Sequence, residues 1–203
     1  LSWQTRQVSH KEIIMPWVKI GSVYQLKIPL RDFRPPIWRR VLVAGHYALA
    51  DLHYVIQFAM GWMDSHLHHF EVGGTRYSLP TPGTDWEDGG EVDSRPVRLD
   101  GIAPSVKMKF LYRYDFGDDW EHDVLVEKIS PPDPKMKYPA CLAGKGACPP
   151  EDVGGVWGYA EFLQAIKDPE HPEHDEYLEW VGDEFDPKAF DLEAVNKALK
   201  RLK

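Results

Sequence analysis

Residues 114–122 contain the densest group of chemically active side chains in this sequence. The segment reads Tyr-Asp-Phe-Gly-Asp-Asp-Trp-Glu-His, so five acidic or histidine side chains and three aromatic ones occupy nine positions. The residues before it (107–114) and after it (120–129) alternate apolar and polar side chains, which is typical of strands. The sequence therefore predicts a β-hairpin with carboxylates at its tip and an indole and an imidazole at the start of its second strand.

The aspartates at this tip, Asp115, Asp118 and Asp119, fit two roles. Paired carboxylates bind Mg²⁺ or act as acid and base, and Asp115 and Asp118 can converge in a tight turn. Aspartates beside a glycine such as Gly117 also accept hydrogen bonds from the backbone N–H groups of the turn. We favour the turn role and keep the chemical role as the alternative.

A metal site is one interpretation of the histidines and cysteines. Period-two geometry places His66 and His68 on one face of a strand, and His122 on the same face as Trp120. The side chains that we consider as ligands of a zinc or magnesium ion are His68, His122, Asp118, Cys141 and Cys148. The cysteine spacing, Cys-x6-Cys, is wider than that of a zinc knuckle. Hydrogen-bonded histidines and buried thiols are therefore the preferred interpretation.

Residues 148–155, Cys-Pro-Pro-Glu-Asp-Val-Gly-Gly, predict a stiff loop that either completes a site with the hairpin tip or covers an edge strand. His53 lies one residue off the apolar stripe of a predicted helix, where it borders the core and can face a cleft. The whole candidate cluster is His53, His66, His68, Asp115, Asp118, Asp119, Trp120, His122, Glu151 and Asp152. The sequence contains no GxGxxG, GxxxxGK[ST], HExxH or GxSxG motif, so nucleotide-binding, zincin and hydrolase folds lose their usual support.

The elements that must position these residues do not follow a strict βαβ alternation. Periodicity predicts strands at 23–29, 37–43, 67–72, 75–79, 107–114 and 120–129, and helices at 49–62, 159–167 and 192–202. Residues 80–96 and 130–158 show no regular period and are predicted as long loops, and 170–186 is an acidic region. We expect an α+β fold: a single-domain roll with a mixed or antiparallel sheet, a central helix after the first strands and helices at the C-terminus.

Composition is consistent with one domain and excludes some functions. The 203 residues are 43% hydrophobic and 12% aromatic, and no apolar run of about 18 residues suggests a membrane span. The net charge is −8, with +2 in residues 1–110 and −10 in 111–203, which disfavours general nucleic-acid binding. Solvated strand-edge charge explains four arginines better than a basic patch does: Arg31, Arg34, Arg39 and Arg40. Two cysteines indicate free or metal-bound thiols in a cytoplasmic protein.

Several motifs occur together and in order, and they carry a family resemblance. They are Pro-Ile-Trp-Arg-Arg (36–40), Leu-His (52–53), Gly-Trp (61–62), His-Leu-His-x-Phe (66–70), Tyr-x-Tyr-Asp-Phe-Gly-Asp-x-Trp-x-His (112–122) and Cys-Pro-Pro-Glu-Asp-x-Gly-Gly (148–155). The set resembles the plasmid Ri (pRiA4b) open-reading-frame-three-like family, also labelled insertion-element passenger proteins of resolvase (TnpR) type. The resemblance covers about residues 20–200. We expect one α+β domain over 20–203, with residues 1–19 an N-terminal extension that is processed or foreign to the natural chain.

The resemblance implies a compact cytoplasmic α+β roll and carries no activity. The resolvase label lacks support, because serine recombination needs an activated serine within an arginine cluster and a DNA-binding helix. The functional hypothesis is a non-catalytic module that recognises a protein or small ligand and is associated with mobile elements. The alternative is a metal-dependent hydrolase or nuclease with a His/Asp site at the hairpin tip.

Overall fold

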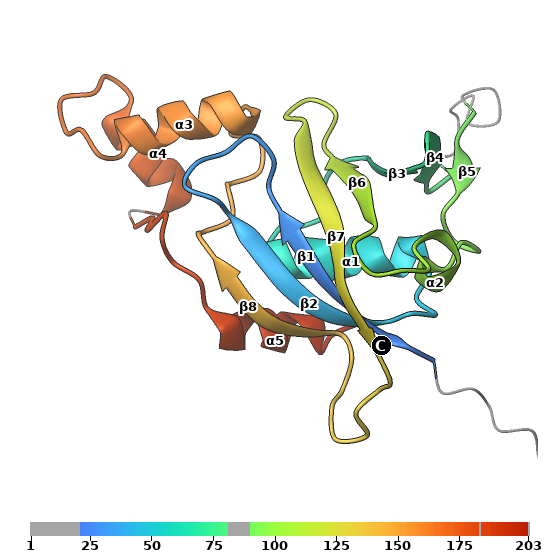
Figure 1. Cartoon of the computed structure of the whole chain (residues 1–203). Helices are drawn as coiled ribbons and strands as arrows, with labels where there is room; N and C mark the ends of the chain where they lie inside the picture. Colours follow the sequence, from blue (N-terminus) through green and yellow to red (C-terminus); the bar gives the residue numbers. More distant parts are fainter. Residues whose placement is uncertain (1–20, 81–89, 183, 203) are drawn as a thin grey trace, which may run out of the picture.

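The computed structural model describes residues 21–80, 90–182 and 184–202, and its core is one eight-stranded sheet (Figure 1). The strands are β1 (Val23–Pro29), β2 (Trp38–Ala44), β3 (His68–Val72), β4 (Thr75–Ser78), β5 (Val92–Asp93), β6 (Lys109–Tyr114), β7 (Trp120–Ser130) and β8 (Ala140–Lys145). Their spatial order is β5-β4-β3-β6-β7-β1-β2-β8. All neighbours pair antiparallel except β4 and β5, which are parallel. The predicted α+β fold with a mixed sheet is confirmed.

Five helices accompany the sheet: α1 (Leu49–Met60), α2 (Leu99–Ile102), α3 (Gly155–Ala165), α4 (His174–Val181) and α5 (Leu192–Leu199). Helix α1 lies across one face of the sheet (Figure 1). Its apolar stripe is fully buried, as expected when side chains recur every three or four residues on one face. Gly61 adopts a left-handed conformation and ends the helix, two residues before the predicted end.

The predicted hairpin is β6 and β7, with Tyr112 opposite His122 and Tyr114 opposite Trp120. The side chains of these four residues are fully buried, because alternate residues of both strands face α1 and the core. The hairpin of β3 and β4 is also confirmed, with Gly73-Gly74 as its turn. His68 opens β3 and pairs with Tyr114, so the two hairpins form one continuous part of the sheet.

Three elements lie in segments for which we predicted neither a helix nor a strand. Strand β8 lies within residues 130–158, α4 lies in the acidic region, and the two-residue β5 lies in the loop 80–96. Strand β8 is flanked by Pro and Gly, and α4 is short and exposed, so neither shows the long apolar period of a buried element. Helix α3 begins at Gly155, four residues before the predicted start. Residues 81–89 of the loop lie outside the described part.

The four arginines do not form one basic surface. Arg31 pairs with Glu121 and Asp123, and Arg40 pairs with Glu127. The prediction of solvated charge is wrong for Arg39, which is 3% exposed and donates hydrogen bonds to the carbonyl groups of residues 38, 59 and 145. Burial lowers its pKa.

Within the described residues, no helix combines the length and the apolar composition that crossing a membrane requires. The predicted N-terminal extension, residues 1–19, lies outside the described part of the chain.

Candidate functional site

Three segments bring a first group of histidine and carboxylate side chains together. His53 comes from the middle of α1, Asp64 from the bend that follows the helix, and His68 from the first residue of β3. One ligand-type atom from each side chain lies within 4.8 Å of the other two. We call this group the His53 cluster. The turn after Gly61 reverses the chain, so that the residues after α1 pass back over the helix and place Asp64 beside His53.

Hydrogen bonds fix the position of His53 on both sides of its ring. Its Nδ1 lies 2.8 Å from the hydroxyl of Tyr112, and its Nε2 lies 2.8 Å from Oδ1 of Asp64. Gln57, one turn along α1, donates from Nε2 to the same Tyr112 hydroxyl at 3.0 Å and accepts the backbone N–H of Asp64 through Oε1 at 3.0 Å. These four side chains form a closed network that holds the imidazole in one orientation.

His68 is the member of the cluster with an unused polar atom. Its ring stacks on that of His53 with centroids 3.5 Å apart and an interplanar angle of 4°. The residue is 6% exposed, and its Nε2 is buried without a hydrogen-bond partner among the described residues. A buried polar atom without a partner costs free energy, typically about 1–3 kcal/mol, which a ligand bound to this nitrogen would recover.

Electrostatics keep the cluster ready to bind a cation. Burial lowers the pKa of both His53 and His68 to about 3, so both rings are neutral near pH 7. Burial raises the pKa of Asp64, while the nearby His68 opposes that shift. Neutral imidazole is the form that coordinates metal ions, and a carboxylate partner would supply negative charge.

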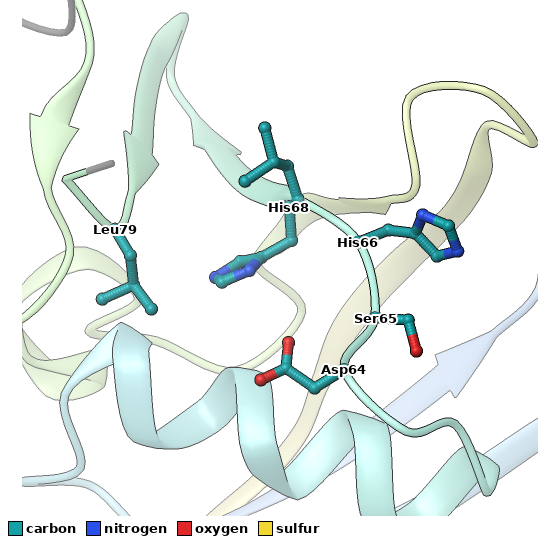
Figure 2. Close-up of a pocket in the computed structure, with 6 residues that line it drawn as sticks. Asp64, Ser65, His66, His68 and Leu79 are labelled. Carbon is teal, nitrogen blue, oxygen red and sulfur yellow. The ribbon is translucent and has the colours of Figure 1, made fainter. Parts of the chain in front are cut away.

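A pocket of about 470 Å³ opens at the cluster, and residues 64–68 and Leu79 line it. Figure 2 shows the side chains of Asp64 and His68 on the side of Leu79, whereas those of Ser65 and His66 extend to the other side of the chain. The side chains of Asp64 and His68 therefore lie on the same side of the chain, and both residues line the pocket.

A second group joins the hairpin tip to the Pro-Glu-Asp loop. His66 Nε2 lies 3.0 Å from Oδ1 of Asp152 and 3.5 Å from Oδ2 of Asp115. Asp115 is buried, but Asp152 is exposed. The prediction that His66 and His68 project from the same strand face is wrong, because β3 begins at His68 and His66 lies in the preceding bend. The two imidazoles therefore belong to different groups.

Glu151 tethers the same loop to the segment that carries Asp64. Its Oε1 accepts hydrogen bonds from the Tyr114 hydroxyl at 2.5 Å and the Met63 N–H at 3.2 Å, and its Oε2 accepts from Ser65 Oγ at 3.2 Å. The Tyr114 hydroxyl also accepts the backbone N–H of Ser65 at 2.9 Å. Burial and this carboxylate together raise the pKa of Tyr114, which stays protonated and donates. Glu151 therefore has a positioning role in the site.

Of the three aspartates of the hairpin tip, Asp115 has the turn role that we favoured. Asp115 Oδ1 accepts the backbone N–H groups of Gly117 at 2.9 Å and Asp118 at 3.4 Å. Asp118 accepts the N–H of Gly154 at 3.1 Å, before the first turn of α3. Asp119 pairs with Arg113 within its own hairpin. In the described structure, Asp115 and Asp118 thus bind backbone N–H groups, whereas Asp119 forms an ion pair.

The remaining predicted site residues lie in the core. Trp120 and His122 are fully buried and pack against Trp62, with ring centroids 5.9 and 5.5 Å away. Within the described chain, neither group of three ligand atoms includes His122, Asp118, Cys141 or Cys148. Both cysteines are free thiols whose pKa is raised by burial.

Three members of the His53 network are absent from our prediction: Gln57, Asp64 and Tyr112. One signal was available, because Gln57 lies four residues after His53 on α1 and such residues share a helix face. Asp64 gave no comparable signal, since its approach to His53 depends on the path of the chain after Gly61. Tyr112 was assigned only to the core face of its strand.

Fold and site together define an α+β protein with a mixed sheet and a cluster of two histidines and an aspartate, two members of which line a pocket. The chain matches the family described as plasmid pRiA4b ORF-3-like protein over residues 22–194, and it belongs to this family. The family prediction is confirmed.

Two relatives agree with this membership. Over 185 residues the chain is 41% identical to "Uncharacterized protein y4hQ" of Sinorhizobium fredii (strain NBRC 101917 / NGR234), covering 90% of this chain and 93% of that protein. It is also similar to the crystal structure of a protein of unknown function, MM3350, from Methanosarcina mazei Go1. That comparison has a TM-score of 0.76 and 40% identity over 86% of this chain and 97% of the other. The α+β fold is therefore shared with the Methanosarcina mazei protein, and the name of neither relative states an activity.

Proposed function

We propose that this protein is a ligand-recognition module that binds a divalent transition-metal ion through His53, Asp64 and His68. The observation that carries the proposal is the buried Nε2 of His68, which has no hydrogen-bond partner among the described residues and lies beside a carboxylate and a second imidazole at a pocket. In this proposal the metal is the centre of the site, and a small ligand occupies the pocket above it.

The donor set supports zinc. Zinc binds imidazole nitrogen and carboxylate oxygen at about 2.0–2.2 Å, and tetrahedral ligands at that distance lie about 3.3–3.6 Å apart. The atoms of the His53 cluster lie within 4.8 Å of one another, so small side-chain rotations suffice to close the site. The ring of His53 is already held by Tyr112, as metal-binding histidines usually are by a neighbouring polar group.

Recognition is favoured over catalysis by the state of the surrounding groups. A hydrolase needs a base that can take a proton from water. Among the described residues, the Glu151 carboxylate accepts three hydrogen bonds and both nitrogens of His53 have partners. In this proposal Glu151 and His53 hold the site in position and His68 serves as a metal ligand, so ligand binding is preferred over catalysis.

Zinc binding by the purified chain tests the proposal. After chelation and removal of the chelator, titration calorimetry is expected to show one zinc ion per chain. His68→Ala and Asp64→Asn each remove a donor, so each is expected to weaken binding by about tenfold to 100-fold or more. A change of tenfold corresponds to about 1.4 kcal/mol.

His66→Ala is the matched control, because His66 lines the same pocket but its ring lies on the other side of the chain (Figure 2). It is expected to leave the affinity within about twofold. Equal losses in His66→Ala and His68→Ala would refute the assignment of ligands. A chain that binds no zinc above background would refute the proposal itself.

A metal-dependent hydrolase or nuclease is the second candidate. It is favoured by the number of protein donors, since three ligands and one open position facing a pocket are typical of catalytic zinc sites. The zinc-loaded chain can be assayed with p-nitrophenyl esters, phosphodiesters and single-stranded DNA. Turnover that disappears in Asp64→Asn would establish catalysis, and zinc binding without turnover would leave recognition as the function.

The proposal also includes the genetic association and the cellular location of the protein. The plasmid in the family's description supports an association with mobile elements. Two free thiols support a reducing, cytoplasmic environment.

A further inference from the structure

A surface groove lies between the Pro-Pro-Glu-Asp loop and α4, and none of the three residues of the His53 cluster lines it. Its first half is a hollow of about 460 Å³ whose apolar lining includes Trp62, Met63, Pro149, Pro150 and Phe185. Its second half is a hollow of about 310 Å³ that the helix α4 borders. Asp152 and Trp180 line both halves, so the two hollows are adjacent.

Large apolar side chains are exposed along this groove. Met63 is 80% exposed and Trp180 is 47% exposed. Exposed apolar surface that lies together in a hollow usually marks a contact site, whereas single exposed side chains need no explanation. The ring of Trp180 packs edge-on against the ring of Phe162, and the two centroids are 6.1 Å apart. This packing fixes the orientation of the indole, part of which stays exposed to the groove.

The second half of the groove is suited to a cation. Tyr177 and Trp180 are three residues apart on α4, which puts them on one helix face, and their ring centroids are 6.2 Å apart. The carboxylates of Asp152, Glu173 and Glu176 line the same hollow. Aromatic faces attract cations, and carboxylates beside them add the opposite charge that a guanidinium or ammonium group requires.

The three carboxylates of this hollow are available to a positively charged partner. No lysine or arginine is found among the lining residues of the two hollows. In the described part of the chain, Glu173 and Glu176 make no ion pair, and Asp152 pairs only with His66. The charge of −10 over residues 111–203 extends the same sign beyond the groove. A partner that matches this surface carries positive charge.

We propose that the groove docks a segment of a partner protein in which an apolar side chain lies near a lysine or arginine. The apolar side chain occupies the hollow beside Pro149 and Phe185. The basic side chain lies over Tyr177 and Trp180, between Glu173 and Glu176. The partner is thus defined by a short apolar-basic pattern, and docking is independent of the metal proposed at His53.

A random heptapeptide library displayed on phage tests this pattern without assuming a sequence. Selection is carried out on the immobilised full-length chain, and the enriched peptides are expected to carry an apolar residue within four positions of a lysine or arginine. The affinity of a synthesised enriched peptide is then measured by fluorescence anisotropy. The double variant Glu173→Gln, Glu176→Gln is expected to weaken it about threefold to tenfold, the range of two exposed ion pairs.

Glu179→Gln is the matched control, because Glu179 is exposed on the same helix but lines neither hollow. It should change the affinity less than twofold. Both glutamates of the double variant are exposed, so circular dichroism is expected to show an unchanged fold. Trp180→Ala supplies an independent variant for the aromatic wall and is expected to weaken binding at least as strongly.

Three results would overturn the proposal. The first is an enriched set without basic residues, or no enrichment at all. The second is a peptide affinity that the double variant and Trp180→Ala leave unchanged. The third is a different occupant: a synthetic peptide of residues 1–20 that shifts the Trp180 indole resonance, or a dimer in sedimentation velocity that Trp180→Ala dissociates, would assign the groove to this chain or to a second copy.

Discussion

The buried histidines of this protein have two different roles although they share one electrostatic state. Burial lowers the pKa of His53, His68 and His122 to about 3 in each case. His53 and His68 lie beside a carboxylate and a pocket, whereas His122 packs among aromatic rings in the core. A lowered pKa therefore identifies a buried imidazole, and only the neighbours distinguish a candidate ligand from a core residue.

His122 predicts how stability depends on pH. Its folded-state pKa of about 3 lies below the unfolded value near 6.5, so the unfolded chain binds a proton between these two values and the folded chain does not. The contribution of His122 is therefore complete above about pH 6.5 and is lost as the pH falls toward 3. Its slope reaches at most about 1.4 kcal/mol per pH unit.

The variant His122→Phe removes this titration, so its free energy of unfolding is expected to fall less steeply than that of the original chain between pH 7 and 4.5. Urea unfolding at several pH values measures both slopes. His46→Gln is the control, because His46 is exposed, and it should leave the slope unchanged. Parallel profiles for His122→Phe and the original chain would contradict the assignment.

At the level of elements, the sheet protects one of its edges with a helix. Strand β8 pairs with β2 on one side, and α5 covers it on the other. Asn196 of α5 pairs with this edge much as a neighbouring strand would: its Oδ1 accepts the Cys141 N–H at 2.9 Å, and its Nδ2 donates to the Cys141 carbonyl at 2.9 Å. Exposed edges are sites of unwanted strand pairing, so this contact serves both stability and solubility.

Asn196→Ala leaves a donor and an acceptor of β8 without their partners. We expect the free energy of unfolding to fall by about 1–3 kcal/mol, and the Cys141 amide to exchange its hydrogen faster than in the original chain. Denaturant unfolding and amide exchange measured by NMR test the two effects. Glu193→Ala, an exposed position on the same helix, should change stability by no more than about 0.5 kcal/mol.

At the scale of the molecule, the hairpin tip and the Pro-Pro-Glu-Asp loop are locked together. Gly155 has a φ of +68°, and a Cβ on it would lie 2.2 Å from the carbonyl oxygen of Asp118. The N–H of Gly154 bonds to the carboxylate of the same aspartate. Segments more than 30 residues apart therefore meet with no room for a side chain. The Pro-Pro-Glu-Asp loop therefore packs directly against the hairpin tip, and the two hollows of the groove lie beside this loop.

Gly155→Ala should disrupt this contact, and Gly182→Ala isolates the part of the effect that is due to backbone strain. Gly182 has a φ of +84°, but a Cβ there would meet nothing within 4 Å. Both variants lose stability because alanine disfavours positive φ. Gly155→Ala is expected to lose about 1–3 kcal/mol more, owing to the collision with Asp118. Equal losses in urea unfolding would show that the segments can separate without cost.

Much of the fold was predictable from local patterns. The strands of the two hairpins and helix α1 alternate or repeat with the period of their own geometry, so neighbouring residues suffice to identify them. Strand β8 and helix α4 were missed because their neighbours in space, β2 and α3, supply the packing that their own short sequences do not show. The mixed sheet was predictable from the periodicity of the sequence, and the family was predictable from its motifs.

The sequence predicts which residues can belong to the candidate site, but it does not predict how they are grouped. The sequence by itself determined which side chains were available, that the C-terminal half is acidic, and that the hairpin at 114–122 has a carboxylate tip. The tertiary structure alone decided that His68 joins His53 and Asp64, while His66 joins Asp115 and Asp152. The reason is physical: these partners come from a helix, a bend, strand ends and a distant loop. The distances between these residues depend on the path of the chain through the turn after Gly61 and into β3. The periodicity of neighbouring residues does not predict that path.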